Sequence, residues 1–171
     1  MKQLFNYYPL DEYEAELTAD YGSFSAYLKA TRLDGAEVFL PTEYHADIAE
    51  LFLPPDYHRE TAEHTVGIHL PYLPHWVAFW RGDEARLAAQ FASREARRAY
   101  FSGADSREEW IERVRISIRR ALLYKPEYLV WHVSEADRDE IYTRDFHYTS
   151  ETVLEATAEL FRSVADIIPN D

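Results

Sequence analysis

Four short apolar runs alternate along the chain with longer segments of helical periodicity. The runs cover residues 3–7, 36–41, 65–70 and 128–133, and the last two are rich in β-branched and aromatic residues. Short apolar runs separated by helical segments indicate buried strands of a parallel sheet. Sequential strands in such folds are usually neighbours, so we expect the order 1-2-3-4. The pattern therefore predicts an α/β protein with a parallel (βα)4 arrangement, which is half of a TIM barrel.

Helical periodicity fills the segments between these runs. We expect helices over residues 11–33, 42–51, 83–100, 106–123 and 150–168. At the start of the fourth helix, Ser106 and Glu109 have the spacing of a capping box, in which Glu109 reaches back to the Ser106 amide. No linker or low-complexity segment interrupts the pattern, so a single half-barrel domain over residues 1–171 is expected, truncated relative to a full (βα)8 barrel.

Charge and composition remove several classes of function. The 171 residues carry 18 Lys and Arg against 31 Asp and Glu, a net charge of −13, which repels the phosphates of nucleic acids. The lack of cysteine excludes disulfides, thiolate nucleophiles and cysteine zinc sites. The N-terminus has no signal-like apolar region, and no run reaches membrane-spanning length. We therefore expect a cytoplasmic protein with no nucleic-acid or membrane partner.

Two histidines mark the expected functional site. His69 and His132 stand near the C-terminal ends of the third and fourth runs, and ligand sites of α/β folds gather at the carboxyl ends of parallel strands. Side chains alternate across a strand, so one face of the predicted sheet carries Asn6, Glu37, His69, His132 and Ser134. If that face points inward, we expect these side chains to converge on one pocket.

The chemistry of this set has two interpretations. Imidazoles and a carboxylate bind Zn²⁺, Mn²⁺ or Mg²⁺, and they also position a sugar hydroxyl or move a proton. On the functional interpretation His69 and His132 bind metal or substrate, Glu37 is an acid, a base or a polar contact, and Asn6 and Ser134 bind substrate. On the structural one, the histidines are hydrogen-bonded core residues and Glu37 is solvated or paired with a Lys or Arg.

An aromatic, proline-stiffened segment follows the third run. In it Tyr72, Trp76 and Trp80 are candidates for a wall that stacks on a sugar ring, and Arg81 is a candidate ligand for a phosphate or carboxylate. The alternative is a hydrophobic plug or an interface patch. The sequence has no P-loop, GxGxxG, nucleophile elbow or HExxH motif, so no nucleotide cofactor is expected.

A four-stranded parallel sheet has two unpaired edges, and its inner face is expected to be too apolar for water. Helices on both faces, a second copy of the chain or a missing second half would each cover it. We expect a homodimer in which two half-barrels close eight strands around a two-fold axis, with the first and fourth strands pairing across subunits.

Three segments resemble the first half of the xylose-isomerase-like TIM barrels. They are Asp34-Gly35-Ala36-Glu37-Val38-Phe39, Ile68-His69-Leu70-Pro71-Tyr72 and Trp131-His132-Val133-Ser134-Glu135. That superfamily contains sugar-phosphate isomerases and epimerases and, more distantly, endonuclease IV. The resemblance implies that His69 with Tyr72, and His132, face the site. It implies metal ligands at the two histidines in the endonuclease branch and substrate contacts in the isomerase branch.

The family's metal-binding and acid/base carboxylates lie on the fifth strand and beyond, and this chain ends before them. The resemblance implies a sugar-phosphate isomerase/epimerase-like protein that acts on a small sugar or polyol by metal-assisted proton transfer. The alternative is a non-catalytic half-barrel that binds a small ligand or only itself.

Overall fold

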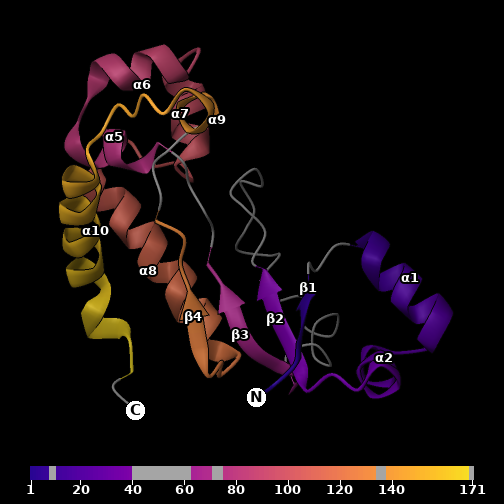
Figure 1. The fold of residues 1–171 in the computed structure, drawn as a ribbon. Helices are drawn as coiled ribbons and strands as arrows, with labels where there is room; N and C mark the ends of the chain where they lie inside the picture. Colours follow the sequence, from indigo (N-terminus) through magenta and orange to yellow (C-terminus); the bar gives the residue numbers. More distant parts are fainter. Residues whose placement is uncertain (8–10, 40–62, 71–74, 134–137, 170–171) are drawn as a thin grey trace. The chain divides into compact units, whose positions relative to one another are not determined.

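A computed structural model of the chain describes residues 1–7, 11–39, 63–70, 75–133 and 138–169 (Figure 1). The helix expected over residues 42–51 lies outside this part of the chain. Contacts divide the molecule into two compact units that alternate along the sequence: Met1–Pro71 with Arg119–Trp131, and Tyr72–Ile118 with His132–Asp171. The organisation as a single domain stays a prediction.

The first unit holds the parallel sheet. Its strands run β1 (Leu4–Tyr7), β2 (Gly35–Phe39), β3 (Thr65–His69) and β4 (Tyr128–Val130), and each pairs in parallel with the next. The order β1-β2-β3-β4 confirms the predicted α/β class and is consistent with a (βα)4 half-barrel (Figure 1).

The fourth strand is shorter than the predicted 128–133. Its pairing ends at Val130, the register partner of His69, where the Leu70 amide donates to the Val130 carbonyl at 2.8 Å. The next residue along the chain from Leu70 is Pro71, which has no N–H to continue the ladder.

One face of the first two strands packs against two helices, α1 (Asp11–Tyr21) and α2 (Phe24–Thr31). The core of this layer is apolar and combines both strands with both helices: Tyr7, Leu17, Phe24, Leu28, Ala36 and Val38. The apolar side of β1 and β2 is therefore covered by helices of the same unit.

The prediction of one helix over 11–33 is wrong. The chain breaks at Gly22, whose φ of +81° lies in the left-handed region that glycine adopts without strain. Ser23 then caps α2 by accepting a hydrogen bond from the Ala26 amide at 3.1 Å. The break therefore comes from local glycine and capping chemistry, which the apolar periodicity does not reveal.

The second unit is built of helices, among the residues that the structure describes. They are α5 (Trp76–Arg81), α6 (Glu84–Gln90), α7 (Arg94–Tyr100), α8 (Arg107–Leu123, in this unit as far as Ile118), α9 (Arg138–Thr143), α10 (Ser150–Val164) and the 3-10 turn η1 (Ala165–Ile167). The single helix predicted over 83–100 is two helices, because Ser93 caps a new one by accepting from the Ala96 amide. Neither α5 nor α9 was expected from the apolar periodicity.

The predicted start of α8 is half confirmed. Ser106 accepts from the Glu109 amide at 3.2 Å, as a capping box requires. The Glu109 carboxylate instead accepts from the Asp105 amide at 2.8 Å. Ser106 therefore caps the helix, but the reciprocal bond goes to the preceding residue.

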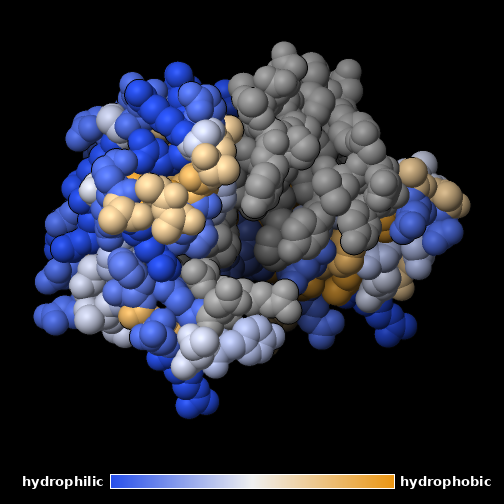
Figure 2. Space-filling view, turned by 90° about the horizontal axis from the view of Figure 1, so that it is seen from above, coloured by the Kyte–Doolittle hydropathy of each residue, from blue (hydrophilic) through white to orange (hydrophobic). Residues whose placement is uncertain are grey.

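Aromatic side chains form the core of the second unit. Trp76 stacks on Trp110 with ring centroids 6.0 Å apart, and Phe79 stacks on Phe101 at 4.0 Å. The surface of this unit is mostly hydrophilic in the view of Figure 2, with hydrophobic residues in places. In the described parts of both units, no helix has the length and hydrophobicity needed to cross a bilayer.

Candidate functional site

One row of residues crosses all four strands. Asn6 of β1 is in register with Glu37 of β2, Glu37 with Gly67 of β3, and Gly67 with Tyr128 of β4. His69 lies two residues further along β3, so its side chain points to the same face as the row. The parallel register therefore places a carboxylate, an imidazole and a phenol on neighbouring positions of one face.

The Glu37 carboxylate is hydrogen-bonded at both oxygens. Its Oε1 lies 2.5 Å from His69 Nε2, and its Oε2 accepts a hydrogen bond from the Tyr128 hydroxyl, also at 2.5 Å. The side chains of His69 and Glu37 are only 11% and 19% exposed. Short hydrogen bonds to an ionised carboxylate in partly buried surroundings are stronger than bonds between neutral groups. The three strands are thus joined through one side chain.

Gly67 makes this arrangement sterically possible. Glu37 and Tyr128 stand two strands apart, a separation of about 9–10 Å between backbones. A Cβ atom added at Gly67 would come within 2.7 Å of three atoms of the Tyr128 side chain, including its hydroxyl oxygen. The absence of a side chain at Gly67 leaves the space through which Tyr128 reaches Glu37.

Tyr128 is a donor at every physiological pH. Its surroundings raise the pKa of the phenol from 10.0 to about 12, with partial burial as the first cause and the hydrogen bond to Glu37 as the second. The negative charges of Glu37 and Glu127 act in the same direction. A neutral phenol therefore faces the carboxylate.

Tyr128 contacts Glu37 and was not predicted from the sequence as part of the candidate site. Its signal was present, since it has the same parity in its strand as Val130 and His132. What was missing was the register, because only the pairing of Gly67 with Tyr128 shows that the phenol faces a gap rather than a side chain.

The other residues predicted for this site are less closely joined to it. Asn6 is exposed and lies beside Glu37 in the register row. His132 is exposed, follows β4 and belongs to the second unit, so its pairing with His69 stays a prediction. Tyr72 and Ser134 lie outside the described residues.

The predicted metal site depends on how many donor side chains lie together. Within the part of the chain that the structure describes, no three residues among His, Cys, Asp and Glu are grouped as metal ligands. Glu37 and His69 supply two donors, and His69 Nε2 already faces the carboxylate. Since zinc sites use three or four protein ligands, these two residues alone do not form one. Binding of a divalent ion by His69 and His132 stays a prediction.

Trp76 and Arg81, also predicted to bind substrate, belong to the second unit. Trp76 is 2% exposed and stacks on Trp110, a position that favours the packing alternative. Arg81 is exposed and lines a hollow of about 240 Å³ together with Trp80, Arg107, Glu155, Ala156 and Glu159.

The hollow beside Arg81 already contains paired charges. The Arg107 guanidinium lies over the Trp80 ring, 3.6 Å from its centre, and 3.3 Å from the Glu159 carboxylate. Glu159 also accepts a hydrogen bond from the Trp80 indole at 2.9 Å, the main reason why its pKa is lowered. The binding of an anion by Arg81 stays a prediction.

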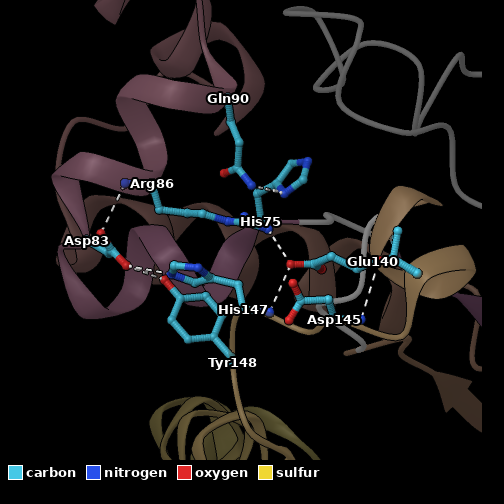
Figure 3. A network of polar contacts seen from close by, with 9 residues as sticks. His75, Asp83, Arg86, Gln90, Glu140, Asp145, His147 and Tyr148 are labelled. Carbon is cyan, nitrogen blue, oxygen red and sulfur yellow. Dashed lines mark hydrogen bonds and ion pairs between the residues drawn. The ribbon is translucent and has the colours of Figure 1, made fainter.

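The second unit contains a further polar network, at the start of α6 (Figure 3). Asp83 caps that helix by accepting from the Arg86 amide at 3.1 Å. The same carboxylate accepts from the Tyr148 hydroxyl at 2.8 Å and lies 3.2 Å from His147 Nε2. The Arg86 amide is the first cause of the lowered pKa of Asp83, and Tyr148 and His147 add to it.

A partly buried ion pair continues this network. Arg86 donates to the Glu140 carboxylate at 2.7 Å, and their side chains are 18% and 11% exposed. Glu140 also accepts from the His147 amide at 3.1 Å (Figure 3). These contacts join α9 and the segment after it to α6. The polar groups of this network therefore cross-link elements of the second unit.

Comparisons of the chain with protein-family models, with curated proteins and with solved structures find no match. A function therefore rests on the geometry of the residues themselves, and the resemblance to the xylose-isomerase-like barrels stays a prediction.

Proposed function

We propose that the first unit carries a proton-transfer site of the isomerase/epimerase kind for a small sugar or sugar phosphate, with His69 as the general base. The observation that supports this most is the 2.5 Å contact between Glu37 Oε1 and His69 Nε2 at the carboxyl end of β3. A carboxylate beside one ring nitrogen keeps the proton on that nitrogen. The other nitrogen, Nδ1, then carries the lone pair that accepts a proton.

The reaction follows from these two groups. His69 Nδ1 removes a proton from the carbon next to the carbonyl of an open-chain sugar, and the electrons of the broken C–H bond form an enediolate. The Glu37 carboxylate stabilises the imidazolium that results. His69 returns the proton to the former carbonyl carbon while the hydroxyl proton passes from one enediolate oxygen to the other, which gives the isomer. Delivery of a proton from water to the opposite face of the original carbon gives the epimer, and His69 then releases its own proton to solvent. A positioned general base contributes about 10²- to 10⁴-fold to such a step.

Other parts of the expected function are not needed for this step. A divalent ion on His69 would occupy the ring nitrogen that accepts the proton, so metal binding by His69 and His132 is an alternative to this step and not a part of it. A cytoplasmic location and a homodimer belong to the same proposal and rest on the sequence alone.

Exchange of substrate hydrogen for deuterium tests the proposed function. The purified protein is incubated in D₂O with dihydroxyacetone phosphate, ribulose 5-phosphate or xylose, and loss of the C–H signal next to the carbonyl is followed by ¹H NMR. We expect exchange with at least one probe, lost in His69→Gln. The matched control is His64→Gln, a histidine of the same unit that bonds to Ser25 at 2.7 Å. No exchange with any probe, or equal exchange in His69→Gln, would contradict the proposal.

The alternative is a binding protein without catalysis. One observation favours it: both oxygens of Glu37 are already hydrogen-bonded, as in a carboxylate that only connects strands. Calorimetry with the same probes separates the two functions, because a binding protein gives a binding signal with no deuterium exchange.

A further inference from the structure

We propose that Tyr128 is a positioning residue for this site: its hydroxyl reaches across the gap at Gly67 and fixes the Glu37 carboxylate in the orientation that sets the tautomer of His69. The inference rests on the proposed function, because positioning affects catalysis only if His69 transfers protons. Tyr128 begins β4, and Gly67 stands between it and Glu37 in the register row.

The geometry of the Glu37 carboxylate supports this role. A glutamate side chain rotates about several bonds, so each hydrogen bond to its carboxylate narrows the orientations that the carboxylate adopts. Here a second bond of the same length, 2.5 Å, reaches the other oxygen from β4. With both oxygens engaged, Oε1 is directed at His69 Nε2.

The residues at positions 67 and 128 also fit each other. The phenol lies where a side chain of residue 67 would stand, since all three atoms nearest to an added Cβ belong to Tyr128. A strand interior disfavours glycine, whose cost relative to alanine is about 0.5–1 kcal/mol. The glycine is therefore explained by the space that Tyr128 needs in order to reach the carboxylate.

The neutral charge of the Tyr128 side chain also suits this role. A Lys or Arg in place of Tyr128 would neutralise Glu37 and weaken its attraction for an imidazolium. A phenol donates a hydrogen bond without adding a positive charge, and its pKa of about 12 keeps it protonated. Tyr128 therefore holds the carboxylate in place while Glu37 keeps its charge for His69.

Imidazole ¹⁵N NMR of the full chain, without any substrate, tests this inference. In the wild type we expect one His69 tautomer, protonated at Nε2, with an Nε2 proton that exchanges slowly with water. Tyr128→Phe keeps the ring and removes only the hydroxyl. We expect it to populate both tautomers and to speed exchange of that proton about tenfold, the factor that matches one hydrogen bond to a charged group.

A second variant and a control complete the design. Gly67→Ala keeps the hydroxyl but pushes the ring away, and we expect the same change in the His69 spectrum. Tyr21→Phe, an exposed tyrosine at the end of α1, is expected to leave it unchanged. An unaltered tautomer and exchange rate in Tyr128→Phe would overturn the inference, whatever Gly67→Ala does.

The result also separates this inference from the proposed function. Where a probe sugar exchanges deuterium, Tyr128→Phe is expected to slow that exchange about 10- to 100-fold, the usual effect of removing a partner that orients a reacting group. If the His69 tautomer depends on Tyr128 but no probe sugar exchanges deuterium, the positioning of His69 is supported and the proposed function is contradicted. Deuterium exchange of the probe sugar at the wild-type rate in Tyr128→Phe would contradict the positioning role.

Discussion

Glu37 Oε1 meets His69 Nε2 along a diagonal of the sheet, at 2.5 Å. The residue directly opposite Glu37 is Gly67, and the residue opposite His69 is Phe39. The two side chains therefore meet only because glutamate is long enough to extend along the strand direction. This makes the length of the side chain at position 37 as important as its charge.

Glu37→Asp tests that length. The shorter side chain withdraws the carboxylate by about one C–C bond, ~1.5 Å, and leaves its charge in place. Because small misplacements of a reacting group cost about 100-fold, we expect deuterium exchange to fall by that order. Glu127→Asp, an exposed glutamate of the same unit that pairs with Lys2, is the control. An exchange rate within a factor of two of the wild type would show that the diagonal contact does not orient His69.

Gly67→Ala is expected to destabilise the first unit by about 1–3 kcal/mol, as for other side chains inserted into filled space. The atoms in the way all belong to Tyr128, so the cost should shrink when that ring is removed. Urea unfolding of Gly67→Ala, Tyr128→Ala and the double variant gives a double-mutant cycle. Additive losses in the double variant would show that the two positions do not compete for space.

The sheet was predictable from sequence, but its helices were predictable only in part. Apolar runs located all four strands, because burial on a parallel sheet leaves a continuous signal. The helix break at Gly22 and Ser23 was missed because a few capping atoms decide it. Trp76 looked like a ligand wall from its sequence context, whereas the second unit uses it as core.

The site was predictable as two residues and not as a cluster. His69 was predicted because it stands near the end of an apolar run, and Glu37 because strand alternation places it on the same face as His69. Tyr128 was not found, because an aromatic residue at the start of a strand looks like ordinary core. The register that brings its hydroxyl to Glu37 depends on long-range pairing, which periodicity within one strand does not contain.

The composition of the sheet face bears on the expected homodimer. On the face of the sheet that carries the site, the described residues include Asn6, Glu37, His69 and Tyr128, so this face is more polar than a dimer driven by burial of an apolar inner face requires. The edges at β1 and β4 remain a reason to expect pairing between copies. Sedimentation at low and high salt, over a range of protein concentrations, measures whether copies of the chain associate. A 20.1 kDa species under all these conditions would contradict the dimer.

Asp83 is expected to stabilise the second unit in two ways. Asp83→Ala removes the cap of α6 together with the contacts to His147 and Tyr148, at a cost of about 1 kcal/mol for the cap alone. Asp83→Asn keeps a capping oxygen and loses the charge, so it should cost less. Chemical unfolding of both variants at neutral pH measures this, and equal losses would show that charge and not capping matters.

The lowered pKa of Asp83 fixes the sign of a pH effect. The folded protein keeps this carboxylate ionised at a pH where the unfolded chain has already taken up a proton. The stability that the ionised Asp83 carboxylate adds to the folded protein is therefore complete above the ordinary pKa of aspartate. This stability is lost as the pH falls through the lower pKa of the folded state. The difference in stability between the wild type and Asp83→Asn should shrink on acidification, and a difference that grows would have the wrong sign.

The raised pKa of Tyr128 predicts a loss of stability at high pH, whereas the lowered pKa of Asp83 predicts one at low pH. Its pKa rises from 10.0 to about 12 on folding, so between these values the folded protein retains a proton that the unfolded chain releases. The unfolded state then binds fewer protons, and the free energy of unfolding must fall as the pH rises from about 10 to about 12. The chain has 13 tyrosines, so the effect of this one is measured as a difference from Tyr128→Phe. Urea unfolding of both proteins across this range should show the wild type losing more stability than the variant. Parallel losses would mean that the Tyr128 hydroxyl is not held by Glu37 in solution, and with that contact the fixed orientation of His69 would also be lost.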